Sequence, residues 1–177
     1  MGRHQFRADW HDYNVGIYFI TICTHDRRHL FGEIAESEMM LSPLGCLVES
    51  AISDLPAHHD IKLLNHVVMP NHVHILVDIG NGLASDNIDS TGAGCIKPAK
   101  FDKSCSRTHY QSRLSVVLRS LKAYVTYAAN RKGLNEGKIW QRLYHDHIVR
   151  SQDSFDRIWN YIDNNVTNWD QDCFKDQ

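Results

Sequence analysis

The alternation of apolar and polar positions divides the first part of the chain into a strand, a short hairpin and a helix. The run GIYFITIC at 16–23 is rich in β-branched and aromatic residues, which favours a buried strand. Residues 33–41 show a weaker pattern, which predicts a short hairpin or an edge strand. From Pro43 to Pro56 apolar side chains recur at helical spacing, and the two prolines suit the first turn and the end of a helix.

The later segments predict a strand pair and two more helices. The runs KLLNHVVM at 62–69 and HVHILVDI at 72–79 are typical of strands, and the Pro70-Asn71 pair between them suits a tight antiparallel turn. Periodicity then predicts a helix, an extended segment and a last helix at 112–132, 138–150 and 153–166. This order indicates an α+β fold of ferredoxin-like type, an antiparallel sheet with helices packed on one side of it.

The length and the apolar runs favour one domain away from membranes. With 177 residues the chain is near the usual size of a domain, and we expect a single domain over 1–177. Residues 80–111 are polar and glycine-rich without periodicity, so we expect a long loop there that is mobile in part. No apolar run approaches the roughly 20 residues of a membrane span, and no apolar core follows the basic N-terminus. These features predict a cytoplasmic location.

The cysteines favour no disulfide framework. Their number is five and they form no CxxC pair, so we expect reduced, structural thiols. Cys95, Cys105 and His109 share one polar segment, but their spacing fits no common zinc site.

Charge is segregated along the chain although the net charge is only −2. Residues 32–96 carry nine acidic and one basic side chain, whereas residues 97–150 carry twelve basic and three acidic ones. A basic half of this kind either binds a polyanion or forms one of two solvated faces.

His72 and His74 stand at alternate positions of a predicted strand. Their side chains therefore project to the same side, roughly 6.5 to 7 Å apart along the chain, and can converge on one metal ion that needs at least one further ligand. Two exposed histidines on the wet face of a hairpin are the alternative. A metallo-β-lactamase-like site needs an Asp-His pair downstream, where LVDI follows, and Asp78 is an imperfect substitute for the glutamate of a cupin-like site.

The last predicted helix carries a polar edge beside its apolar stripe. At 100° per residue, Tyr161 and Asn165 fall on one shoulder of that stripe. A packing role, with the ring buried and the hydroxyl wet, is the alternative for this tyrosine.

Three motifs in order, VVMPNHVHILV, WQRLYHDHIVR and YIDNN, resemble the single-tyrosine HUH transposases and most of all the REP-associated tyrosine transposases. The resemblance extends from the first strand to Trp169. It implies the HUH endonuclease fold, with His72 and His74 as metal ligands, Tyr161 as the nucleophile and Asn165 as the third ligand. In one departure, the proline that usually follows this asparagine is Val166 here.

The resemblance also implies an activity. It predicts a single-stranded DNA endonuclease and strand transferase that uses Mg²⁺ or Mn²⁺ and forms a 5′-phosphotyrosine and a free 3′-OH, on hairpins with single-stranded flanks. Imidazole ligands suit Mn²⁺ better than Mg²⁺. A phenol has a reference pKa of about 10, so the attacking tyrosine needs a lowered pKa or a base. The protein is expected to act as a monomer or a homodimer.

We also assign expected roles to the remaining histidines and to residues that could contact DNA. The second H-x-H run includes His147, which the resemblance places near the site as a neighbour of the ligands or a structural residue rather than as a ligand. His58, His59 and His66 show no partner pattern and are expected on the surface or in the core. DNA contacts are expected from Arg113, Arg119, Lys122, Arg142 and Trp140, with stacking by Trp140, Tyr144 or His145.

Two rival hypotheses remain open on the sequence alone. One is a catalytically idle DNA-binding or regulatory protein with the same fold, which the departure at Val166 keeps possible. The other is a histidine-metal hydrolase of small substrates, unrelated to DNA. Covalent trapping on a single-stranded oligonucleotide separates the nuclease from both.

Overall fold

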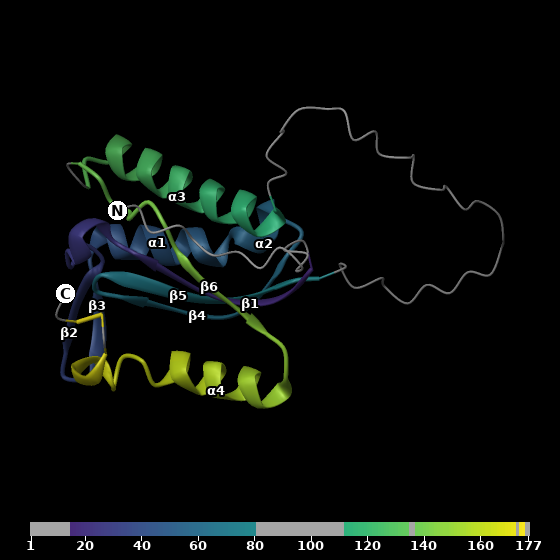
Figure 1. The fold of residues 1–177 in the computed structure, drawn as a ribbon. Coiled ribbons are helices and arrows are strands. Elements are labelled where there is room, and N and C mark those ends of the chain that lie inside the picture. Colours follow the sequence, from purple (N-terminus) through teal and green to yellow (C-terminus); the bar gives the residue numbers. More distant parts are fainter. Residues whose placement is uncertain (1–14, 81–111, 135–136, 173, 176–177) are drawn as a thin grey trace, which may run out of the picture.

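A four-stranded antiparallel sheet organises the chain (Figure 1). The structure, a computed structural model, describes residues 15–80, 112–134, 137–172 and 174–175. The strands follow the order β4 (Lys62–Met69), β5 (His72–Ile79), β1 (Gly16–Cys23) and β6 (His145–Val149). A separate hairpin joins β2 (Gly32–Ala35) and β3 (Glu38–Leu41). The helices are α1 (Pro43–Ser53), α2 (Leu55–His58), α3 (Arg113–Arg131) and α4 (Gln152–Asp163), with 3₁₀ turns η1 (His25–Arg27) and η2 (Trp169–Gln171).

The predicted α+β fold with an antiparallel sheet is confirmed, including the β4–β5 hairpin and the short hairpin before α1. Of the extended segment predicted over 138–150, only 145–149 is a named strand, and Trp140 adds an isolated bridge to Thr24. The expected loop lies outside the described residues apart from Gly80, as do the cysteines and the histidine weighed as zinc ligands. No described helix combines the length and apolarity that a bilayer span requires.

The expectation that helices cover one side of the sheet is wrong. Figure 1 shows α1 and α3 on one face and α4 on the opposite face. The physical reason is that the central strands bury both faces: all but one residue of β5 is buried. Side chains alternate along a strand, so one set packs with α1 and α3 in the main core while the other set needs a second cover.

The main core lies on the α1–α3 face. Tyr18 and Ile20 of β1 and Val73 and Ile75 of β5 are fully buried there. The opposite face of the same strands carries Thr21, His72 and His74, since the pairing sets Thr21 beside His74 and Cys23 beside His72. The apolar core therefore fixes which side chains meet α4.

Serine side chains cap the helices that frame the sheet. The hydroxyl of Ser42 accepts a hydrogen bond from the Gly45 N–H at 3.0 Å, and Ser151 caps α4 in the same way through Ser154 at 3.2 Å. The predicted end of the last helix is wrong, because α4 ends at Asp163 and not at 166. The Asn165 N–H donates to the Ile162 carbonyl, a tightened turn that suits a run of Asp and Asn with weak helix propensity.

Candidate active site

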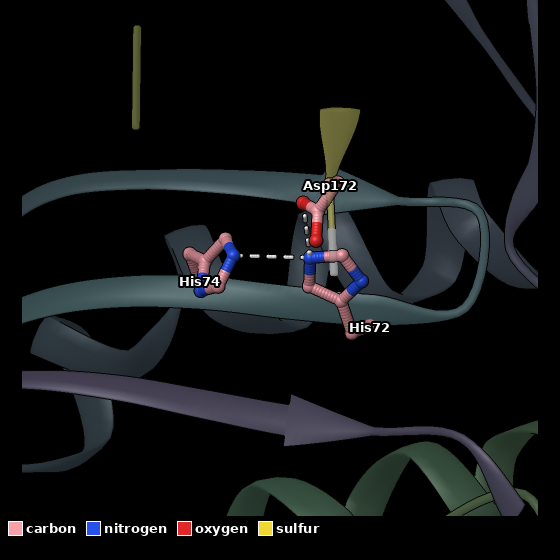
Figure 2. Close-up of side chains that lie close together, drawn as sticks. All are labelled: His72, His74 and Asp172. Atoms are coloured by element: carbon pink, nitrogen blue, oxygen red, sulfur yellow. Dashed lines mark hydrogen bonds and ion pairs between the residues drawn. The ribbon is translucent and has the colours of Figure 1, made fainter. Parts of the chain in front are cut away.

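The two histidines of β5 are buried and converge. Their side chains are almost fully buried, with His72 at 0% and His74 at 1% exposure, so the alternative of a wet face does not hold. Their Nε2 atoms lie 3.0 Å apart. Figure 2 shows the two rings directed toward each other. The strand register alone aligns them, because both belong to the set that faces away from the main core.

Oxygen atoms hold the far side of each ring. The Nδ1 of His72 lies 2.8 Å from Asn71 Oδ1, and the Nδ1 of His74 lies 2.8 Å from the Thr21 hydroxyl. The Asn71 Nδ2 donates to the Phe174 carbonyl at 2.7 Å, which fixes the orientation of the amide. An amide oxygen only accepts, so the proton of His72 is on Nδ1 and its Nε2 is left with a lone pair. Metal-binding histidines have outer oxygen partners of this kind.

Burial keeps both rings neutral. Desolvation, with smaller contributions from His74 and Arg27, lowers the pKa of His72 to about 2. Desolvation also lowers the pKa of His74 to about 3. The 3.8 Å approach of Asp172 Oδ2 to His72 Nε2 is therefore a contact of a carboxylate with a neutral ring and not an ion pair. Neutral imidazole is the form that binds a metal.

A carboxylate that no motif or spacing predicted, that of Asp172, completes the cluster. The Asp172 side chain is 3% exposed, and its Oδ1 accepts from the Phe174 N–H at 2.7 Å. Its Oδ2 is buried and has no hydrogen-bond partner among the described residues. The candidate ligand atoms of His72, His74 and Asp172 lie within 4.8 Å of one another (Figure 2). Two imidazoles and a carboxylate form a donor set suited to a divalent transition metal.

Asn165 offers a second oxygen without a partner. It follows α4 in the tightened turn and is 3% exposed. Its Oδ1 is buried and makes no hydrogen bond within the described part of the chain. A buried acceptor left without a donor is costly unless a cation or a water satisfies it. The residue predicted as third ligand therefore fits a metal, and its role stays a prediction.

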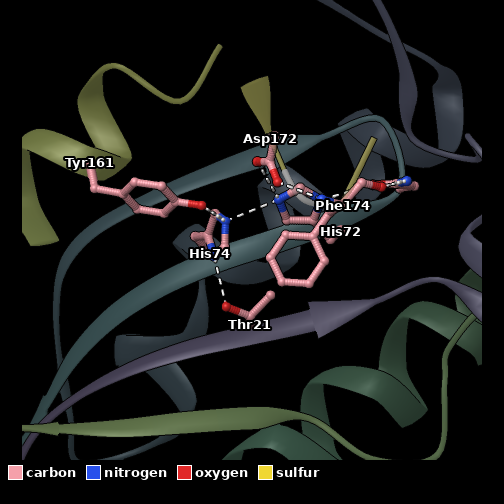
Figure 3. A network of polar contacts seen from close by, with 7 residues as sticks. Thr21, His72, His74, Tyr161, Asp172 and Phe174 are labelled. Carbon is pink, nitrogen blue, oxygen red and sulfur yellow. Dashed lines mark hydrogen bonds and ion pairs between the residues drawn. The ribbon is translucent and has the colours of Figure 1, made fainter. Parts of the chain in front are cut away.

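Tyr161 reaches the histidine pair from α4. Its hydroxyl lies 3.2 Å from the Nε2 of His74, on the side of the ring away from Thr21 (Figure 3). The residue is nevertheless 42% exposed. Phe19 stacks on the His74 ring at 5.1 Å and meets the tyrosine ring edge-on at 6.0 Å. The phenol is thus both held beside the cluster and open to a ligand from solvent.

The segment after α4 covers His72. The Trp169 ring stacks on the imidazole at 6.1 Å between centroids, and the Phe174 ring lies 4.8 Å from it. The Arg27 guanidinium stands 4.4 Å from the centre of the Phe174 ring. These contacts enclose the cluster on the side away from Tyr161, as Figure 3 shows for Phe174.

The second H-x-H run lies near the site without joining it. His147 is exposed on β6, and its strand partner on β1 is Phe19. Its side chain therefore shares the α4 face, two strands away from the histidine pair because β1 lies between β5 and β6. No contact joins it to His72 or His74 among the described residues. His66 is bonded to Glu49 at 2.7 Å, away from the site.

The residues expected to bind DNA divide into two groups. Trp140 is 9% exposed and packs on Phe31 in the main core. The ammonium of Lys122 donates to the Gln141 carbonyl at 3.0 Å, and burial lowers its pKa to about 8. Arg113 donates to Asp60 at 2.7 Å. These three side chains are engaged within the protein.

The other two, Arg119 and Arg142, line a groove of about 550 Å³ along α3. Tyr127 and Tyr144 also line this groove, which lies on the opposite face of the sheet from α4.

The comparisons with known proteins agree with the fold. No model of a known protein family matches the chain. An uncharacterized protein of Haemophilus influenzae is 32% identical over 178 residues, which covers 96% of this chain and 91% of that protein. The solved structure of a REP-associated tyrosine transposase bound to a REP hairpin has a TM-score of 0.57 at 16% identity, covering 94% of this chain and 74% of that chain. The chain therefore belongs to one family with the Haemophilus influenzae protein, and it has the fold of the REP-associated tyrosine transposases.

Proposed function

We propose that this protein is a metal-dependent, single-tyrosine transposase that cuts and joins single-stranded DNA. One observation carries the proposal: Tyr161, a residue 42% exposed, places its hydroxyl 3.2 Å from the Nε2 of His74 in a buried histidine pair. A nucleophile open to solvent beside converging ligand atoms is the arrangement that phosphodiester cleavage requires. The structural similarity to a transposase supports the same class of reaction.

The residues around the pair fit a divalent ion. His72, His74 and Asp172 would hold it, with Asn165 as a further oxygen ligand. A mixed set of nitrogen and oxygen donors suits Mn²⁺ better than Mg²⁺, which prefers oxygen and water. A bound ion would withdraw charge from a non-bridging oxygen of the phosphate.

Tyr161 then performs the chemistry. Its phenolic oxygen forms a bond to phosphorus while the bond from phosphorus to O3′ breaks. The phenol gives up its proton and the departing 3′ oxygen takes one up. The 5′ end stays attached to the protein as a phosphotyrosine ester, which a different 3′-OH can attack to join two strands without a nucleotide cofactor.

Single-stranded DNA that contains a hairpin is the proposed substrate. The α3 groove offers Arg119 and Arg142 for phosphates and tyrosine rings for bases. Because this groove and Tyr161 lie on opposite faces of the sheet, a DNA that occupies both passes around the β6 edge. A cytoplasmic location and a monomeric or homodimeric state belong to the same proposal.

The first prediction concerns the nucleophile. Wild-type protein with Mn²⁺ and a labelled hairpin with single-stranded flanks should form a denaturant-resistant adduct through the 5′ phosphate. Tyr161→Phe keeps the ring and its packing but removes the attacking oxygen, so it should bind the DNA normally and form no adduct. Tyr124→Phe, a change at an exposed tyrosine of α3 outside the proposed DNA groove, is the matched control. An adduct that persists in Tyr161→Phe, or maps to another tyrosine, contradicts the assignment.

The second prediction concerns the metal. Removal of a ligand should weaken Mn²⁺ binding, measured by titration calorimetry, at least about tenfold in Asp172→Asn and more in His74→Ala. Asn165→Ala should weaken it as well if its orphaned oxygen is a ligand. His66→Ala, whose ring binds Glu49 outside the site, serves as the control, and circular dichroism checks folding. Unchanged affinity in His74→Ala would exclude this site.

The third prediction concerns pH. Both histidines have folded pKa values far below the unfolded value of about 6.5, so the unfolded chain takes up protons first as the pH falls. The contribution of the two neutral rings to the free energy of unfolding is therefore fully present above about pH 7. It decreases below about pH 6.5, by up to about 1.4 kcal/mol per pH unit for each ring. Urea unfolding of metal-free protein at about pH 7 and about pH 5 measures this decrease.

The double variant His72→Gln/His74→Gln should show a much shallower decrease between these pH values. His145→Gln, a change at an exposed ring on β6, should keep the wild-type slope. Equal slopes in wild type and the double variant would mean that the two rings do not stay neutral.

The fourth prediction concerns the DNA surface. Arg119→Glu and Arg142→Glu should weaken binding of all single strands alike and reduce the salt dependence of log K by about one unit for each arginine that meets a phosphate. Lys62→Glu on the opposite edge strand is the control for net charge. Fluorescence anisotropy over a salt series makes the measurement, and unchanged affinity in both arginine variants would move the binding surface elsewhere.

A further inference from the structure

The segment after β1 is pinned beside the histidine pair. The Thr24 N–H and the Thr24 hydroxyl both donate to the Asn71 carbonyl, at 2.9 and 3.0 Å. Asn71 also binds His72 through its side chain. The turn that orients His72 therefore also fixes the position of the residues that follow β1, including Arg27.

The backbone of this segment adopts an uncommon conformation. Asp26 and Arg27 both have φ near 54°, in the left-handed region that side chains other than glycine rarely adopt. Backbone strain of this kind is unfavourable and is concentrated at functional sites. The surrounding bonds of Thr24 hold it in place.

The Arg27 guanidinium lacks an anion. Its Nη1 is buried and has no hydrogen-bond partner among the described residues, and no carboxylate in that part of the chain pairs with it. The Phe174 ring, whose centre lies 4.4 Å away, offers a cation–π contact but no negative charge. Arg27 as a whole is half-buried, and a buried N–H of a charged group that lacks an acceptor is unfavourable. The guanidinium is therefore prepared for an anionic ligand.

The position and shape of the Arg27 guanidinium indicate which kind of anion it binds. The outer nitrogens of His72 and His74 are bound to Asn71 and Thr21. The Arg27 guanidinium stacks on the Phe174 ring, which in turn lies 4.8 Å from the His72 ring, so its positive charge stands on that side of the cluster. An arginine fork matches the geometry of phosphate oxygens, and the negative charge on those oxygens grows as a phosphodiester is attacked.

We propose that Arg27 is a catalytic residue that binds a non-bridging oxygen of the scissile phosphodiester through its guanidinium, on the His72 side of the cluster. No bond to Arg27 forms or breaks; it donates hydrogen bonds that strengthen as Tyr161 attacks. Because the Phe174 ring covers the guanidinium, a phosphate reaches Nη1 only when that ring moves aside. This role rests on the proposed function.

Single-turnover adduct formation at saturating DNA tests the role. Arg27→Gln should slow the reaction by about 10²–10³-fold, the effect of removing one charge-stabilising donor, while the Kd for DNA and for Mn²⁺ changes less than about threefold. Arg27→Lys should restore part of the rate. Arg28→Gln changes the exposed neighbouring arginine and should react like wild type. Thermal melting checks that each variant is folded.

A methylphosphonate at the cleaved position gives a sharper readout. It removes the charge of one non-bridging oxygen, so the penalty of Arg27→Gln should fall below about tenfold on this substrate if the guanidinium binds that charge. An equal penalty on both substrates, or a wild-type rate in Arg27→Gln, overturns the role of Arg27 and leaves the proposed function intact. Absence of any adduct in wild type overturns both.

Discussion

Two imidazole rings buried at alternate positions of a central strand impose the main constraint on this structure. A buried ring keeps its place only if its nitrogens find partners, because an unsatisfied polar atom in the interior is costly. The outer nitrogens are held by Asn71 and Thr21. The inner nitrogens face each other, with the Tyr161 hydroxyl and the Asp172 carboxylate beside them. The turn before β5, the neighbouring strand, α4 and the C-terminal segment must all be in register for this to occur.

The two faces of the sheet differ: one carries the apolar core and the other carries the polar cluster around His72 and His74. Its α1–α3 face is a continuous apolar core, so loosened packing there affects folding. Its α4 face carries polar side chains that matter through their positions relative to one another. The structure describes all of α4, and within this helix Ile162 alone is buried. A cover that is this lightly packed leaves Tyr161 exposed while holding its hydroxyl beside His74. The rigid face thus positions groups for the reactive one.

Local patterns predicted the elements that carry the strongest periodicity, and with them His72, His74 and Tyr161. The same periodicity predicted too long a last helix. A pattern of apolar positions carries no information on the weak helix propensity of the Asp and Asn residues at the end of this helix. The basic segment and the family resemblance also suggested Trp140 as a stacking residue, because an aromatic side chain among basic residues gives no sign of its burial against Phe31.

The local sequence pattern could not predict the residues that reach the cluster from other parts of the chain. Thr21 belongs to a strand that looks purely apolar, and Asp172 follows a 3₁₀ turn with no periodicity. Only the strand register and the path of the C-terminal segment reveal that these side chains meet the histidine pair. Sequence spacing finds groups within one element, whereas tertiary contact assembles the remainder.

The charges around the cluster explain why these particular groups belong together. The two histidines contribute no charge, and the charges of Asp172 and Arg27 sum to zero, although no ion pair joins these two residues. A divalent ion would therefore leave the site with two positive charges. A phosphodiester carries one negative charge, and a second develops as a tyrosine oxygen attacks. Under the proposed function, the arrangement would therefore be closer to electrical balance with the transition state than with the bound substrate, which is what catalysis by differential binding requires.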